Sequence, residues 1–291
     1  MAASLATYSL IVLGGWVRIT GSGLGCGDHW PLCNGRLIPS LDDPATLIEW
    51  GHRLVAALVS FLTALITVWA FRRRRDPGWS GRFRASTWAV SLLTLQVLLG
   101  AVTVWLQLPP WSIVLHLGTA MAFLALLLSV AWGRADGTST ISFGGPGAAP
   151  ARWALALALL SACVVLLGAL VANLGAAPAC QGFPLCNGSF APGGDWRISL
   201  HWIHRLSAYV LVLGALTLPL ARSGRREPTA WIAAGLAVTQ VAVAAVMVIQ
   251  ILPAVWRGLH LAVGAAVFAA LVAHADASAR QARPPGPLQG A

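Results

Sequence analysis

Eight apolar stretches, each about 20 residues long, constrain this chain more than any other feature of its sequence. A helix of that length spans the hydrocarbon core of a bilayer and satisfies its own backbone hydrogen bonds there. The composition agrees, because only 10% of the 291 residues are charged and 57% are hydrophobic. We therefore predict an all-α integral membrane protein with transmembrane helices over residues 2–19, 47–70, 85–107, 112–132, 153–174, 199–220, 230–251 and 257–275.

The positive charges are concentrated in the connections between these segments. All 19 basic residues are arginines, and the net charge is +10. They cluster after the second, fourth and sixth segments, at Arg72–Arg75, Arg82, Arg84, Arg134, Arg152, Arg222, Arg225 and Arg226. Because positively charged loops stay in the cytoplasm, we predict a multi-pass cell-membrane protein with cytoplasmic termini and with loops 20–46 and 175–198 facing outward. No nucleic-acid recognition motif accompanies the charge, so membrane lipid, and not nucleic acid, is the expected contact.

An internal repeat organises the chain. Residues Pro31–Gly35 (PLCNG) recur 153 positions later as Pro184–Gly188. Further matches in register are Leu13-Gly14 with Leu167-Gly168, Cys26 with Cys180, and Gln96-Val97 with Gln240-Val241. An even number of segments in each half gives the two halves the same orientation in the membrane, so the repeats are parallel.

The repeat predicts a division into two bundles. We expect two parallel-repeat four-helix bundles, at residues 1–132 and 153–275. A cytoplasmic linker at 133–152 would join them, and a disordered cytoplasmic tail would follow at 276–291, where Pro, Gly, Gln and Arg are frequent.

Four histidines lie a few residues inside otherwise apolar segments. They form two pairs that follow the repeat, His52 with His116 and His204 with His260. All four fall at a similar depth near the outward face, where ionisable groups are costly unless they bind something. Haem iron takes two axial ligands from facing helices at matched height, so we predict haem ligation by each pair. The alternative is interhelical hydrogen bonding by each histidine.

Arginines follow the first histidine of each pair. Arg53 follows His52, and Arg205 follows His204. A guanidinium suits the carboxylate geometry of a haem propionate, which makes both arginines candidates for cofactor binding. Snorkelling of the side chain to the outer surface explains the two positions equally well.

Glu49 distinguishes the two halves. It lies one helical turn before His52, whereas His201 occupies the matching position of the second repeat. The run Thr46–Glu49 also fits a capping box, in which Glu49 only stabilises the start of a helix. Because the acid accompanies a histidine in only one half, we favour a functional role for its carboxylate.

The cysteines are placed in register in the two outward loops. We predict two disulfides within loops, Cys26 with Cys33 and Cys180 with Cys186, in a compartment that permits them. A zinc site would need tighter spacing and further ligands, and a redox-active bridge is the remaining alternative. We expect Cys163 to pack inside the fifth segment, and we assign no ligand role to His29 or His274.

Taken together, these motifs resemble the haem A synthase family. The resemblance covers about residues 5–275. It rests on the eight segments, on Glu49-x-x-His52-Arg53, on the three further histidines, and on a first loop in which Gly21–Cys26 runs into Trp30–Gly35.

The resemblance implies an activity and a role for each half. The family oxidises the C8 methyl of haem O to a formyl group, by successive hydroxylation, and releases haem A. By this likeness His204 and His260 hold a resident haem b, whereas His52 and His116 face the substrate haem. Glu49 would then lie beside the reacting methyl, and the family's first-loop cysteine pair would be Cys26 and Cys33.

The resemblance also implies partners. Haem O would be delivered by the farnesyl-adding haem O synthase, and electrons would pass to an acceptor that the sequence does not identify. A homo-oligomer is compatible with the sequence.

The main alternative function is a di-haem b-type cytochrome that carries electrons across the membrane without modifying haem. An electron carrier accounts for the four histidines but not for a single acid in one repeat. A third possible function, haem transport, accounts for paired sites but would not need fixed ligands at matched depth.

Overall fold

The computed structural model describes residues 1–40, 42–77, 79–131, 149–221 and 227–281. Within them the chain forms eight helices that are long and apolar enough to cross a membrane. These are α1 (Ala2–Ile19), α2 (Pro44–Arg72), α3 (Trp79–Trp105), α4 (Pro110–Ala131), α5 (Ala149–Asn173), α6 (Trp196–Thr217), α7 (Pro228–Ile249) and α8 (Ala254–Gln281). Two short 3-10 turns, η1 (Ala177–Ala179) and η2 (Leu218–Leu220), complete the regular structure of this part. The predicted all-α membrane fold is confirmed.

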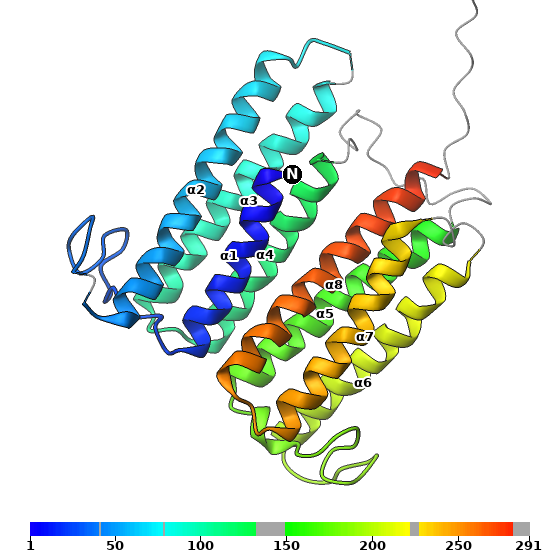
Figure 1. Ribbon diagram of the computed structural model, residues 1–291. Coiled ribbons are helices and arrows are strands. Elements are labelled where there is room, and N and C mark those ends of the chain that lie inside the picture. Colours follow the sequence, from blue (N-terminus) through cyan, green and yellow to red (C-terminus); the bar gives the residue numbers. More distant parts are fainter. Residues whose placement is uncertain (41, 78, 132–148, 222–226, 282–291) are drawn as a thin grey trace, which may run out of the picture.

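The helices lie in two groups. Figure 1 shows α1–α4 on one side of the molecule and α5–α8 on the other, with the helices of each group nearly parallel in space. We call these the N-terminal and C-terminal helix groups. In both views the loop before α6 lies at the end of the molecule opposite the N-terminus, and in Figure 1 the loop before α2 lies at that same end. The connection between α2 and α3 lies at the other end (Figure 1).

The main core forms where the two groups meet. Helices α1 and α4 pack there against α5 and α8. Buried side chains of this cluster include Ile11, Leu124, Leu157, Phe268 and Leu271. Many of its other buried members are alanines, which let helix backbones approach closely where no hydrophobic effect between helices operates.

The start of α2 corrects the capping-box interpretation. The N-cap is Asp43, whose carboxylate accepts a hydrogen bond from the Thr46 amide at 2.8 Å, and Pro44 occupies the first turn. The helix therefore begins three residues earlier than the segment predicted from residue 47. Glu49 lies nearly two turns inside α2, too far from its end to serve as the acid of a capping box.

Two other boundaries differ from the predicted organisation. Helix α5 begins at Ala149, inside the predicted linker, and α8 continues to Gln281, inside the predicted tail. The extension of α8 carries a continuous buried run from Leu271 to Ser278, so packing holds this stretch in helical form despite its polar residues. The rest of the predicted linker, residues 133–148, and the tail from residue 282 lie outside the described residues.

Candidate functional site

His204 and His260 face each other inside the C-terminal helix group. His204 comes from α6 and His260 from α8, and their ring centroids are 6.4 Å apart. Two axial bonds of about 2 Å each, together with the two ring radii, require a centroid separation of about 6 Å. The observed ring separation matches this distance.

Neighbouring groups fix the orientation of the His204 ring. Its Nδ1 lies 3.1 Å from the carbonyl oxygen of Val164 on α5. Because a carbonyl can only accept, Nδ1 carries the proton and Nε2 keeps its lone pair for a metal. Gly168, one turn further along α5, makes room for the ring, since a Cβ there would lie 3.0 Å from Cε1 of His204.

Gln240 of α7 positions His260. Its amide nitrogen lies 3.0 Å from Nδ1 of His260 and donates to the backbone oxygen of the same residue at 2.9 Å. Gly264, one turn after His260, leaves space for this amide, because a Cβ there would lie 3.1 Å from the Gln240 nitrogen.

In the N-terminal helix group, glycines and a glutamine again lie beside the two histidines, His52 and His116. A Cβ on Gly14 would lie 3.0 Å from Cε1 of His52, and one on Gly100 would lie 3.2 Å from Cε1 of His116. Gln96 of α3 is 3.1 Å from Nε2 of His116 and accepts a hydrogen bond from the Thr119 hydroxyl. Both glutamines belong to the repeated Gln-Val dipeptides. That register was visible in the sequence, but nothing in it indicated contact with the histidines.

The His52 and His116 rings contain polar atoms that the protein leaves unsatisfied. In the described part of the chain, Nδ1 of each is buried and has no hydrogen-bond partner. A buried polar group in that state costs about 1–3 kcal/mol. Unpartnered imidazole nitrogens of this kind suit a bound metal or cofactor.

Glu49 connects α2 to the first cysteine loop. Only 4% of the residue is exposed. One carboxylate oxygen lies 2.6 Å from an Arg53 nitrogen, and the other accepts the Cys26 amide at 2.8 Å. Arg53 also donates to the backbone oxygens of His29 and Leu32, at 3.1 and 2.6 Å. The acid is thus held in a buried ion pair beside His52, one turn further along the same helix.

Arg205 binds the second cysteine loop in the same way as Arg53 binds the first. It donates to the carbonyl oxygens of Cys180, Gly182 and Leu185 at 2.6, 2.8 and 2.9 Å. Its Nε donates to His201 Nε2 at 3.3 Å, so a neutral imidazole stands where Glu49 stands in the first half. Both arginines therefore bind loop carbonyls, a role not foreseen from the sequence, and contact with a haem propionate stays a prediction.

The structure pairs the four loop cysteines as expected. Cys26 is bonded to Cys33 and Cys180 to Cys186, with sulfur–sulfur distances of 2.00 and 2.04 Å. Cys163, by contrast, is exposed on α5, so the packing role predicted for it is wrong. The sequence could not show which face of this uniformly apolar helix turns outward.

The remaining two histidines lie away from the pairs. His29 is exposed in the first loop, 3.5 Å from Asp28. His274 lies near the end of α8, where its ring nitrogens are 3.0 Å from the Thr229 hydroxyl and 3.4 Å from the Ser278 hydroxyl.

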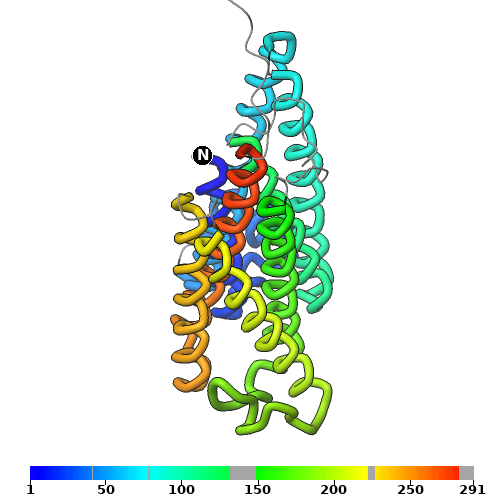
Figure 2. The backbone as a smooth tube through the Cα atoms, turned by 90° about the vertical axis from the view of Figure 1, so that its right-hand side faces the viewer, coloured from blue at the N-terminus to red at the C-terminus, as the bar shows by residue number. Residues whose placement is uncertain are grey.

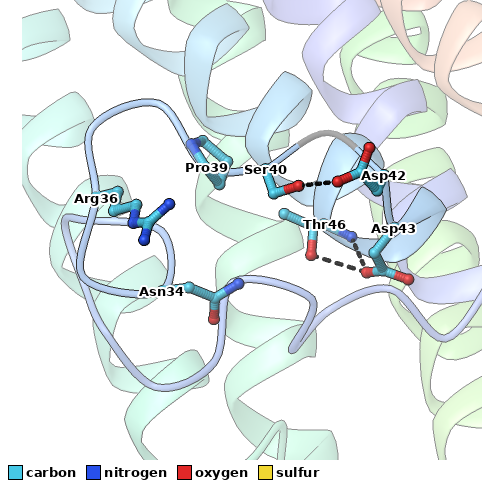
Figure 3. A pocket seen from close by; sticks show the side chains of 7 residues that line it. All are labelled: Asn34, Arg36, Pro39, Ser40, Asp42, Asp43 and Thr46. Carbon is cyan, nitrogen blue, oxygen red and sulfur yellow. Dashed lines mark hydrogen bonds between the residues drawn. The ribbon is translucent and has the colours of Figure 1, made fainter.

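A polar pocket of about 350 Å³ lies in the first loop (Figure 3). Asp43 and Thr46 line one side of it and are joined by the hydrogen bonds of the α2 cap, and the Ser40 hydroxyl bonds to Asp42 nearby. None of the four paired histidines lines this pocket. It is a feature of the loop and the helix start, separate from the histidine sites.

Similarity to known proteins identifies the family. Residues 1–272 match the model of the COX15-CtaA family, described as cytochrome oxidase assembly protein. A "Heme A synthase" of Symbiobacterium thermophilum is 35% identical over 229 residues, which cover 75% of this chain and 73% of that protein. One of Shouchella clausii is 35% identical over 219 residues (74% and 72%), and one of Geobacillus kaustophilus 31% over 243 residues (78% and 72%). The chain therefore belongs to the COX15-CtaA family of cytochrome oxidase assembly proteins.

Proposed function

We propose that this protein is a haem A synthase, an oxidoreductase that converts the C8 methyl of haem O to the formyl group of haem A. The observation that carries the proposal is the repeated histidine pair with a buried acid in one repeat only. The names of the relatives support it, since each of those compared is called "Heme A synthase".

The two helix groups divide the work. His204 and His260 would hold a resident haem b, which when bound supplies one-electron redox chemistry. His52 and His116 receive the substrate haem, with its C8 methyl towards Glu49. The 6.4 Å spacing of the His204 and His260 rings, and the unpartnered Nδ1 atoms of His52 and His116, support this assignment.

Glu49 acts on the protons of the reaction. Two successive hydroxylations convert the methyl to a geminal diol, which loses water to leave the aldehyde. Each hydroxylation replaces a C–H bond by a C–O bond with oxygen from water, and it releases two protons and two electrons that pass to the acceptor. A carboxylate held out of water beside the methyl accepts a proton or stabilises positive charge that develops there. Arg53 holds that carboxylate in place from the same helix.

The cysteine loops cover the outward ends of both groups. We propose that they face outside the cell membrane and that both termini are cytoplasmic, as the arginine clusters after α2 and α6 require. Arg53 and Arg205 keep these loops closed over the helix ends. Delivery of haem O by the farnesyl-adding synthase, and transfer of electrons to a separate acceptor, complete the proposal.

The test is the haem content of cells. Wild-type protein, expressed in a strain that makes haem O but not haem A, should lead to haem A among the extracted haems on chromatography. A purified protein that binds haem while its host contains only haem O and haem B would instead be an electron carrier, and the proposal would be wrong.

A further inference from the structure

Helices α2 and α3 are longer than the helices packed against them. Helix α2 has 29 residues and α3 has 27, whereas α1 has 18 and α4 has 22. At 1.5 Å per residue α2 is about 43 Å long, which matches a bilayer with both of its headgroup regions, about 40–45 Å. Figures 1 and 2 show the connection between α2 and α3 projecting past the N-terminus of α1. This end of the α2–α3 hairpin therefore reaches the level of the lipid headgroups.

The hairpin end combines a high positive charge with aromatic side chains. Between residues 69 and 84 a single acid, Asp76, accompanies six arginines: Arg72, Arg73, Arg74, Arg75, Arg82 and Arg84. The same stretch contains four aromatic residues: Trp69, Phe71, Trp79 and Phe83. The positive-inside rule accounts for the charge, and the interfacial preference of tryptophan accounts for the rings. Neither of them requires the arginines and the rings to be in contact.

Two of these arginines are stacked on the tryptophans. The Trp69 and Trp79 rings pack edge to face, with their centroids 4.7 Å apart. The Arg73 guanidinium lies over both rings, 5.4 Å from each centroid, and that of Arg82 lies over Trp79 at 4.8 Å. Distances below about 6 Å are those of cation–π contacts. We call these four residues the arginine–tryptophan cluster.

Stacking leaves the two arginines able to bind an anion. A guanidinium carries its five N–H donors in its plane, whereas an aromatic ring contacts its face. The ring contact therefore orients the group without using its donors, which suit the bidentate binding of a phosphate. Arg73 is exposed and Arg82 is partly exposed, so a ligand can reach both.

The apolar surface next to the cluster belongs to the bilayer. Helix α2 packs against α1 and α3, and its remaining surface carries exposed apolar side chains such as Phe61 and Leu65. That surface continues to Trp69, which is itself exposed and belongs to the cluster. Acyl chains cover such a surface on a membrane-spanning helix, and the phosphates of the same lipid molecules then lie level with the arginines. The cluster is therefore continuous with the lipid contact and complementary in charge to an anionic headgroup.

We propose that the arginine–tryptophan cluster binds the phosphate of an anionic phospholipid. Groups of about four to eight basic residues at the end of a transmembrane helix attract anionic lipids in general. The two stacked guanidiniums make this attraction a site, because their donors are held in fixed directions. A lipid bound here holds the end of α2 opposite to the end that carries Glu49 and His52. The proposal goes beyond the haem chemistry and does not depend on it.

The experiment measures lipid binding to the purified full-length protein by native mass spectrometry. Phosphatidylglycerol and phosphatidylcholine with identical acyl chains are titrated separately. We expect the wild type to bind phosphatidylglycerol about tenfold more tightly, and Arg73→Gln/Arg82→Gln to abolish that preference. Arg73→Lys/Arg82→Lys keeps the charge and should still lose most of the preference, because an ammonium lacks the planar set of donors.

The matched control is Arg225→Gln/Arg226→Gln. It removes the same charge from residues 217–230, the matching connection of the second half, which contain no aromatic residue. It should keep the wild-type preference, and circular dichroism should show equal helix content in all variants.

The proposal is overturned if the wild type does not distinguish the two lipids, or if the glutamine variant of the cluster keeps the preference. Full preference in the lysine variant, or equal loss in the control, would show that charge alone attracts the lipid, and the site would not exist. Displacement of the lipid by a polyglutamate peptide that binds the wild type but not the glutamine variant would assign the cluster to an acidic protein segment and would likewise overturn the proposal.

Discussion

The Glu49 carboxylate accepts a hydrogen bond from the Cys26 amide at 2.8 Å, although 23 residues separate them in the chain. The bond joins the helix that carries His52 to the first disulfide loop. The other carboxylate oxygen is bound by Arg53 at 2.6 Å, so both oxygens have partners. Substitutions here change the charge beside the histidine and the anchoring of the loop together, and the two effects need separate measurements.

Glu49→Gln should abolish most haem A formation. Glutamine keeps the shape and can still accept the Cys26 amide, but it removes the base and the charge that pairs with Arg53. The measurement is chromatography of extracted haems, where the singly hydroxylated intermediate should accumulate while the haem b spectrum persists. His201→Gln, at the matching position of α6, is the control and should retain activity. Wild-type haem A in the Glu49→Gln strain would leave Glu49 only a structural role.

Loss of the second histidine pair should abolish the resident haem, and loss of the first should not. His204→Ala or His260→Ala removes one of two axial ligands, so the low-spin haem b spectrum should disappear from the purified protein. His52→Ala should keep most of that spectrum and lose turnover. Equal loss of colour from variants in the two helix groups would contradict the division of labour.

The glycines beside the histidines should be sensitive to a single methyl group. In Gly168→Ala the new Cβ would lie 3.0 Å from the His204 ring, which must then move by a few tenths of an ångström. We expect a shifted haem b spectrum, as the axial ligand tilts. Gly14→Ala should lower haem A formation and leave that spectrum unchanged, because Gly14 faces His52. Gly235→Ala has open space and should behave as wild type in both assays.

Arg205→Lys should loosen the second cysteine loop. The guanidinium donates to three loop carbonyls, and a lysine ammonium on its flexible stem cannot reproduce that planar set. Hydrogen exchange of the loop amides should become at least about tenfold faster, the change expected when a buried charged hydrogen bond is lost. Arg197→Lys, on the exposed first turn of α6, should have no effect. Unchanged exchange in Arg205→Lys would show that the disulfide alone orders the loop.

The cap of α2 should weaken only in acid. Hydrogen bonds from the amide and hydroxyl of Thr46 hold the pKa of Asp43 below its ordinary value. Because the Asp43 pKa is lower in the folded protein than in the unfolded chain, the ionised carboxylate stabilises the helix start at pH values above the unfolded pKa of about 4. This contribution is lost as the pH falls through the folded pKa. Exchange of the Thr46 amide, corrected for its intrinsic pH dependence, should therefore accelerate below about pH 4. Asp43→Asn, a neutral cap, should remove that acceleration.

The eight helices, the two repeated histidine pairs and the two cysteine pairs can be predicted from the sequence. Hydropathy over about 20 residues is a local property, and in lipid it leaves the backbone few alternatives to a helix. The internal repeat then placed His52 with His204 and His116 with His260, because equal positions in parallel repeats lie at equal depth. These features need only the order of residues along the chain.

Which side chains meet depends on the packing of the helices. The rotation of each helix about its axis turned Cys163 outward and brought Gln96 and Gln240 to the histidines. The path of the first loop delivered the Cys26 amide to Glu49, which the local sequence had equally suggested as a helix cap. Such contacts join segments that are distant in the chain, and they depend on packing across the whole helix assembly. A pattern of apolar residues repeated on every face of a helix carries no information about that packing.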